Sequence, residues 1–200
     1  MFAKIMNIKL IDSNKYSLEE LLVSSFLSSE DKEYLSTFKV EQTKKEKAVS
    51  LIIKRKLIGE YQINEFGKPI SNTKHFNISH SNGVVVYVEG NANIGIDIEH
   101  LKHPNKNMIE YISSGDELKY IKDEKTFFEI WTSKESLVKS LGTGINEQIK
   151  TIPGLPLSGV VKYKNKSLYR ENITINDYVI SVTQEGEKPF RLKIERIDIL

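Results

Sequence analysis

The sequence has 200 residues, of which 39% are hydrophobic and 28% are charged, so its composition is that of a folded globular protein rather than a disordered or fibrous one. Its 29 lysines and arginines stand against 27 aspartates and glutamates, and a net charge of +2 excludes a strongly basic nucleic-acid binder. The absence of cysteine excludes disulfides, thiolate metal sites and a cysteine nucleophile. We therefore expect a cytoplasmic protein that binds neither nucleic acid nor membrane, because no apolar run reaches the roughly 20 residues of a membrane helix.

The first part of the chain predicts one strand and three helices. Ile5 to Ile11 is an apolar-rich run that favours a strand. Ser17 to Glu20 and Ser28 to Asp31 each fit a helix start, in which a serine oxygen accepts a free backbone amide. Apolar residues then recur at helical spacing from about Gln42 to Tyr61, which predicts a long and basic third helix.

A turn and three strands are expected next. Phe66-Gly-Lys-Pro69 is a turn signal. His75 to Ile78 and Val84 to Val88 predict short strands. Gly90-Asn-Ala-Asn93 predicts a turn from the second of these into Ile94 to Ile98, so we expect those two strands to form a hairpin.

The second part of the chain is helical and then alternating. Its strongest helix is predicted from about Thr126 to Leu141, with Gly142 as its stop. After Pro153 the pattern predicts antiparallel strands with one solvated face. These strands are Val160–Tyr163, Tyr178–Val182 and Phe190–Ile199.

Both parts follow the order strand, helices, strands. We therefore predict an α+β fold of two similar halves, residues 1–93 and 94–200, with antiparallel strands, packed helices and an active site between the halves. Ile5 to Asp12 and Ile94 to Glu99 are the expected equivalent first strands.

Three short segments carry side chains suited to chemistry. In Gly95-Ile-Asp97-Ile-Glu99 the two acids are two residues apart in a strand, so they point to the same side. Two neighbouring carboxylates repel each other unless a proton or a cation lies between them, and Mg²⁺ accepts such oxygen ligands. The alternative is a solvated strand edge that carries two acids.

The second segment is Trp131-Thr-Ser-Lys-Glu135-Ser-Leu-Val-Lys139, in which Glu135 and Lys139 are one helical turn apart. They are either an exposed ion pair or a third oxygen ligand beside a phosphate-binding ammonium. The third segment ends in Ser79-His80-Ser81, whose hydroxyls, amides and imidazole suit an anion. No aspartate is placed as an orienting partner for it, so the sequence gives no support for a Ser-His-Asp hydrolase.

The order of these motifs resembles that of the Sfp-type 4'-phosphopantetheinyl transferases. The order is Gly-Lys-Pro, then Phe-Asn-Ile-Ser-His-Ser, then Gly-Ile-Asp-Ile-Glu, then Trp-x-x-Lys-Glu-Ser-x-x-Lys, from about Phe66 to Gly144. The resemblance implies transfer of the phosphopantetheine arm of coenzyme A to a serine of an apo acyl or peptidyl carrier protein, with release of adenosine 3',5'-bisphosphate.

The resemblance also implies roles for single residues. Asp97, Glu99 and Glu135 match the Mg²⁺ ligands, although Mn²⁺ also suits an all-oxygen site. Glu135 is in addition a candidate base. The residues that match coenzyme A contacts are Lys68 and Pro69 at the adenine end, Ser79 and His80 at the phosphates, and Lys139 at the pyrophosphate. A basic residue that grips the 3'-phosphate is expected at Lys44, Lys45 or Lys47, with Lys47 preferred.

Two further points stay open in the sequence. Asp116 or Glu117 can correspond to an additional acid of the family, and the carrier protein is not identified. The alternative function is a non-catalytic module that binds coenzyme A or a carrier protein on the same scaffold. We expect a monomer, because two halves of one chain can form the site.

Overall fold

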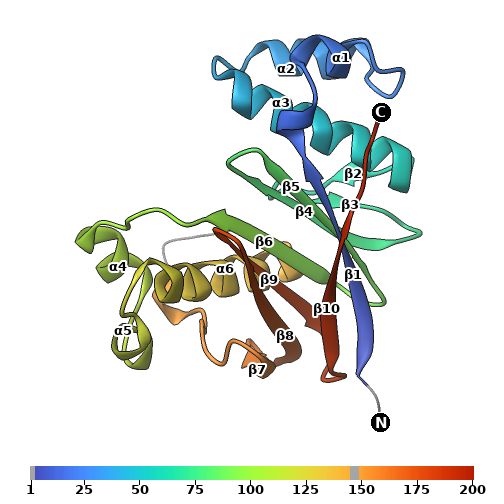
Figure 1. The fold of residues 1–200 in the computed structure, drawn as a ribbon. Helices are drawn as coiled ribbons and strands as arrows, with labels where there is room; N and C mark the ends of the chain where they lie inside the picture. The colour runs from blue at the N-terminus through green and yellow to red at the C-terminus, as the bar shows by residue number, and fades with distance from the viewer. Residues whose placement is uncertain (1–2, 145–148) are drawn as a thin grey trace.

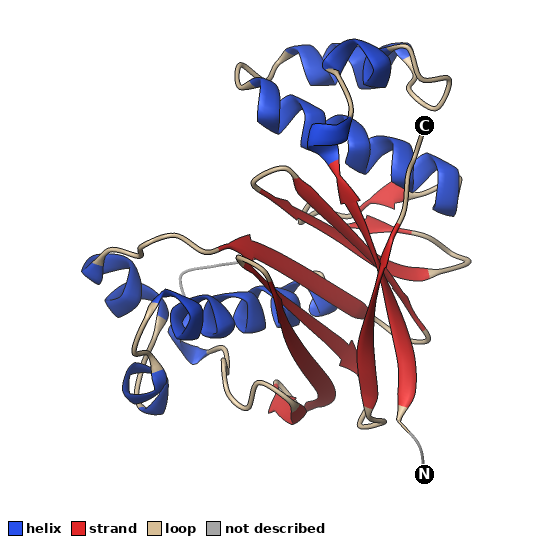
Figure 2. Ribbon diagram, viewed as in Figure 1, coloured by secondary structure: helices blue, strands red, loops and turns tan. Residues whose placement is uncertain are grey.

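The computed structural model describes residues 3–144 and 149–200 and has an α+β architecture, as predicted (Figure 1 and Figure 2). The elements before residue 93 are β1 (Lys4–Asp12), α1 (Leu18–Leu22), α2 (Ser29–Ser36), α3 (Glu41–Ile53), β2 (Gln62–Ile63), β3 (Pro69–Ile70), β4 (His75–Ser81) and β5 (Val84–Gly90). Those after it are β6 (Ile94–His100), α4 (Lys106–Ile112), α5 (Asp116–Tyr120), α6 (Glu124–Leu141), β7 (Gly159–Tyr163), β8 (Lys166–Ile175), β9 (Tyr178–Glu185) and β10 (Phe190–Arg196). None of the described helices is long and apolar enough to cross a membrane.

Three strands of each four-stranded sheet repeat one topology. The first has the strand order β10-β1-β5-β4 and the second has β6-β9-β8-β7. In each sheet the first strand of the half pairs antiparallel with a later strand, which pairs in turn with the strand that precedes it in the chain. Helix α3 packs on the first sheet and α6 on the second (Figure 2). The two similar halves of the prediction therefore correspond to two similar sheets, while the division at residue 93 stays a prediction.

The predicted helix starts are confirmed, and one predicted helix end is wrong. Capping boxes open α1 at Ser17 and α2 at Ser28, and Gly142 ends α6. Helix α3 ends at Ile53 instead of reaching Tyr61, and a π-helical turn follows it. The chain leaves that turn at Gly59 with a φ of +78°, a conformation that cannot continue a right-handed helix.

The predicted hairpin between β5 and β6 is wrong. Both edges of β5 are already paired, one with β1 and one with β4, so no edge is open for β6. The turn at residues 90–93 instead carries the chain into the second sheet, where β6 pairs with β9. The hairpin of this region is the one that β4 and β5 form.

The predicted antiparallel strands at the end of the chain need two corrections. Strand β8 is missing from the prediction because its charged and polar residues obscure the apolar alternation. Strand β10 pairs with β1 in parallel, since the loop after β9 leads to the end of the molecule where β1 begins and places Phe190 opposite Lys4. The last strand therefore completes the first sheet.

One apolar core joins the two sheets. It includes Ile8 and Val86 from the first sheet, Ile96 and Val182 from the second, and Phe190 of β10. All five side chains are at most 2% exposed, so neither sheet has a separate core at this contact. A second cluster lies between α3 and the other face of the first sheet. The shared core fixes β4 of the first sheet beside β6 of the second.

Candidate functional site

Strands β4 and β6 belong to different sheets, yet side chains of β4 bond to β6 at every second residue. Alternate residues of a strand point to one side, so three polar side chains of β4 face β6. The three contacts are Ile96 N–H to Asn77 Oδ1 at 2.9 Å, Ser79 Oγ–H to Asp97 Oδ1 at 2.9 Å and Ser81 Oγ–H to Glu99 Oε2 at 3.0 Å. This alternation orients both carboxylates of β6.

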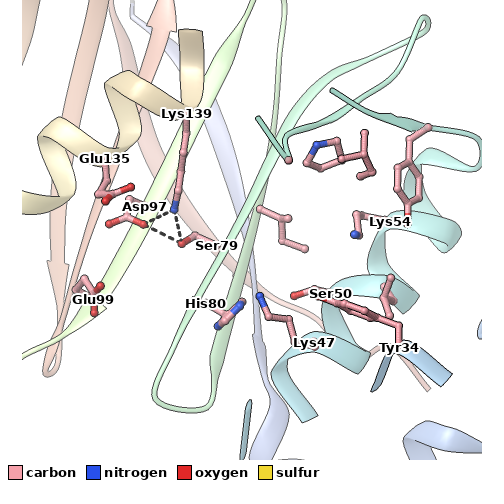
Figure 3. Close-up of a pocket in the computed structure, with 16 residues that line it drawn as sticks. Tyr34, Lys47, Ser50, Lys54, Ser79, His80, Asp97, Glu99, Glu135 and Lys139 are labelled. Atoms are coloured by element: carbon pink, nitrogen blue, oxygen red, sulfur yellow. Dashed lines mark hydrogen bonds and ion pairs between the residues drawn. The ribbon is translucent and has the colours of Figure 1, made fainter. Parts of the chain in front are cut away.

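Helix α6 lies directly on β6 because Gly95 has no side chain. A Cβ atom there would lie 2.0 Å from the Ser136 carbonyl oxygen and 2.3 Å from the Ser140 nitrogen, too close for any side chain. The close approach brings Glu135 and Lys139 to the same cavity as the carboxylates of β6 (Figure 3). The prediction that these two residues share one helix face is confirmed.

The cavity has a volume of about 720 Å³ and two walls of opposite charge. Elements of both halves line it, and its two charged sides face each other in Figure 3. The acidic wall is formed by Asp97, Glu99 and Glu135, and the basic wall by Lys47 and Lys54. Lys139, Ser79 and His80 lie between the two walls. Such a cavity suits a ligand that carries several negative charges at one end.

Lys139 bridges two of the predicted site residues. Its Nζ donates to Asp97 Oδ1 at 2.5 Å and to Ser79 Oγ at 3.0 Å. Burial works against the charged amine, but Asp97 and Glu135 outweigh it and raise the pKa of Lys139. The other carboxylate oxygen of Asp97, Oδ2, is buried and has no hydrogen-bond partner among the described residues. One Asp97 oxygen is thus occupied and the other is free.

Two carboxylates of the acidic wall have raised pKa values because they are buried and lie close to another acid. Burial and the neighbouring Asp97 raise the pKa of Glu135 to about 7, although Lys139 opposes the shift. Burial and Asp97 also raise the pKa of Glu99. Among the described residues, no three His, Cys, Asp or Glu side chains converge closely enough to form a ready metal cluster. The free Asp97 oxygen and the three carboxylates nevertheless have the chemistry that a hard divalent cation requires.

The basic wall comes from α3 and the turn after it. Burial lowers the pKa of Lys47, and the charge of Lys139 lowers it further. Burial lowers the pKa of Lys54 to about 8. The Lys54 ammonium also lies 4.9 Å from the centre of the Tyr61 ring, a distance at which a cation and an aromatic face attract each other. Both lysines are therefore held toward the cavity, away from bulk solvent.

Some of the remaining predicted residues line the cavity, one lies beside it and others do not reach it. Pro69 lines the cavity and so does Lys47, whereas the alternatives Lys44 and Lys45 do not. Lys68 lies beside the cavity, and its ammonium donates to the carbonyl oxygens of Ile94 at 3.2 Å and Ser140 at 3.3 Å. That amine joins the β2–β3 turn to the end of α6.

The two candidates for an additional acid lie outside the cavity. Asp116 is exposed and pairs with Lys119. Glu117 is buried, lies 2.8 Å from Lys134 Nζ and accepts the Gly154 N–H at 2.7 Å. The Glu117–Lys134 pair therefore anchors α5 and the following loop against α6 and supplies nothing to the cavity.

Sequence reasoning missed several contacts of the site. Glu46 is buried and lies 2.7 Å from His80 Nδ1, although no acid near His80 in the sequence suggested a partner. Trp131 donates its indole N–H to Glu99 at 3.3 Å. The alternating polar residues of β4 were a signal from which the contacts with β6 could have been predicted. No such signal existed for the contact between Glu46 and His80, since 34 positions separate the two residues.

Known proteins resemble this chain. Residues 93–183 match the family model of the 4'-phosphopantetheinyl transferase superfamily. The 4'-phosphopantetheinyl transferase gsp of Aneurinibacillus migulanus is 36% identical over 92 residues, which are 42% of this chain and 39% of that protein. The transferase ffp of Bacillus subtilis is 32% identical over 142 residues, and Sfp of Bacillus subtilis strain 168 is 31% identical over 141; each match covers 61% of this chain and 63% of the relative. The chain thus spans less than two thirds of these relatives, and the resemblance predicted from the motifs is confirmed.

Proposed function

We propose that this chain, which is similar to the Sfp-type 4'-phosphopantetheinyl transferases, transfers the 4'-phosphopantetheine arm of coenzyme A to a serine hydroxyl of an acyl or peptidyl carrier protein. The second product is adenosine 3',5'-bisphosphate. The observation that carries the proposal is the cavity itself, in which an acidic wall faces a basic wall across Lys139. We place the active site between the two halves and the reaction in the cytoplasm, with one chain as the active unit.

Coenzyme A supplies the charges that the cavity matches. We assign its phosphate groups to the space between the two walls, where Ser79, His80, Lys47 and Lys139 present hydroxyl, imidazole and ammonium groups. Pro69 and the backbone around Lys68 are assigned to the adenine end. The Lys68 ammonium is bonded to two carbonyl oxygens, so it contributes to this end by holding the turn in place.

We assign Mg²⁺ to Asp97, Glu99 and Glu135, with Mn²⁺ as a substitute. The buried and unpartnered Asp97 Oδ2 supports this assignment, as do the raised pKa values of Glu99 and Glu135, because a cation would relieve their mutual repulsion. A bound divalent ion supplies charge neutralisation at the pyrophosphate.

The protein's own groups orient the transfer and take up its proton. The carrier serine oxygen forms a bond to the β-phosphorus of coenzyme A, and the bond from that phosphorus to the bridging oxygen breaks with its electron pair on the adenosine bisphosphate. Lys139 lies where it can stabilise the charge on the departing phosphate. Glu135, directly or through a water, is the candidate acceptor of the serine proton, since its carboxylate lines the cavity beside Lys139.

The test is intact-protein mass spectrometry of several apo carrier proteins after incubation with this protein, coenzyme A and Mg²⁺, with and without a chelator. We expect a gain of one phosphopantetheine unit that the chelator abolishes. Asp97→Ala and Glu135→Ala are each expected to reduce the rate by at least about 100-fold, the usual scale for loss of a group that stabilises transition-state charge. Asp116→Ala, an exposed acid outside the cavity, is the matched control with full activity.

The outcomes separate the candidate functions. Full single-turnover activity of folded Asp97→Ala or Glu135→Ala contradicts the metal assignment. Binding of coenzyme A without transfer to any carrier favours the non-catalytic module. A gain in mass on one carrier well before the others identifies the preferred partner.

A further inference from the structure

Glu46 is a buried acid of α3 to which the proposed transfer gives no role. It is 6% exposed, and both of its carboxylate oxygens have partners. Oε2 lies 2.7 Å from His80 Nδ1. Oε1 accepts the backbone N–H of Gly83 at 2.5 Å and a longer contact from Gln42 at 3.5 Å. The carboxylate therefore fastens α3 to β4 and to the turn that follows it.

The ionisation state of Glu46 determines which nitrogen of His80 donates a hydrogen bond to it. Burial alone would raise the pKa of Glu46, but the bonds from His80 and Gly83 outweigh burial and lower it, so the carboxylate is ionised. An ionised carboxylate only accepts hydrogen bonds, which makes Nδ1 of His80 the donor. His80 lines the cavity (Figure 3), and with Nδ1 bonded to Glu46 its Nε2 is the nitrogen left for a ligand.

We propose that Glu46 is a positioning residue that holds the His80 ring with Nδ1 on α3 and Nε2 free to donate to a phosphate group of coenzyme A. This inference rests on the proposed function. A phosphate oxygen accepts hydrogen bonds, so it selects the ring form in which both nitrogens carry protons. The Glu46 carboxylate fixes the direction of the ring through Nδ1, as an acid behind a working histidine does in other sites.

The test is a double-mutant cycle on the full chain, with coenzyme A binding measured by calorimetry. Glu46→Gln keeps the size of the side chain and an oxygen for the Gly83 N–H, but removes the charge. We expect it to weaken coenzyme A binding about 10-fold, the scale of a lost charge-assisted hydrogen bond. We expect His80→Ala to weaken binding at least as much, and the double variant to bind no worse than His80→Ala alone. Additive losses, or wild-type binding by folded Glu46→Gln, would overturn the inference.

Steady-state kinetics and NMR distinguish positioning from a structural role. In Glu46→Gln the KM for coenzyme A is expected to rise while kcat stays within about two-fold, as for a lost ground-state contact. Glu41→Gln, an exposed acid of the same helix, is the control with unchanged KM. If Glu46→Gln does not fold, the wild type decides: we expect a slowly exchanging Nδ1 proton on His80, and its absence contradicts the inference.

The proposed function fails separately, if the wild type neither binds coenzyme A nor modifies a carrier. The Nδ1 proton of His80 still tests the contact with Glu46 in that case.

Discussion

Single side chains at the acidic wall show how the fold sets their chemistry. Asp97 is 4% exposed, and Lys139 and Ser79 both donate to one of its oxygens. A buried carboxylate without such donors would destabilise the fold, whereas one with donors on both oxygens would have fewer lone pairs free for a ligand. Asp97 lies between these limits, since its second oxygen is buried and unpartnered.

The fold also alters the protonation equilibrium of Lys68, which leads to a prediction on stability. Burial lowers its pKa from the ordinary 10.5 to about 8 in the folded chain. Between pH 8 and 10.5 the unfolded chain therefore binds more protons at this site than the folded one, and stability rises with pH in that window. We expect the free energy of unfolding of the wild type, relative to Lys68→Met, to increase from pH 8 to pH 10 in urea titrations.

Lys119→Met is the matched control for this measurement. Asp116 raises the pKa of that exposed lysine, so its removal cannot reproduce the pattern of Lys68→Met. A difference between the wild type and Lys68→Met that stays constant from pH 8 to 10 would contradict the altered equilibrium of Lys68.

At the scale of elements, the site depends on how closely α6 approaches β6. The Gly95 contact with the backbone of α6 leaves no room for a methyl group, and it sets the height of Glu135 and Lys139 above the strand. Polar side chains of β4 hold the edge of β6 that is not paired with β9. Strand β6 is thus fixed between a helix and a strand of the other sheet.

We predict that Gly95→Ala separates α6 from β6 and lowers the free energy of unfolding by about 3 kcal/mol, the upper range for overpacking in a rigid core. Urea unfolding followed by circular dichroism measures this change. Gly186→Ala is the control: an added Cβ there meets nothing within 4 Å, but φ is +107°, so that substitution introduces backbone strain alone. A loss for Gly95→Ala no larger than for Gly186→Ala would show that the close approach is not rigid.

At the scale of the whole molecule, the two halves share a strand pairing and an apolar core, and each half would need both to fold. Strand β10 lies at the end of the chain but pairs with β1 (Figure 1). Phe190 of this strand joins a core that also contains Ile8 and Ile96. The first sheet without β10 would expose one edge of β1 and part of this core to water.

We therefore predict that fragments 1–93 and 94–200, the halves expected from the sequence, do not fold when expressed separately. Circular dichroism and urea titration of each fragment are expected to show no cooperative unfolding, whereas an equimolar mixture regains it in part. Cooperative unfolding of fragment 1–93 alone would establish that the first half is an independent domain.

The local sequence pattern by itself determined several elements of the fold and part of the candidate site. Helix starts, the end of α6, the common face of Glu135 and Lys139, and the shared direction of Asp97 and Glu99 follow from spacing within a few residues. Hydrogen bonding and side-chain periodicity act over one turn or one strand, so the sequence contains them directly. The family resemblance rests on the same short segments.

The tertiary structure alone decided the contacts between distant segments. No local rule pairs β10 with β1 in parallel, keeps β5 from β6, selects Lys47 over its neighbours for the cavity, or places Glu46 behind His80. Each of these depends on which strand edges are already occupied and which faces the shared core buries. Those are properties of the whole packed chain, and no window of the sequence contains them.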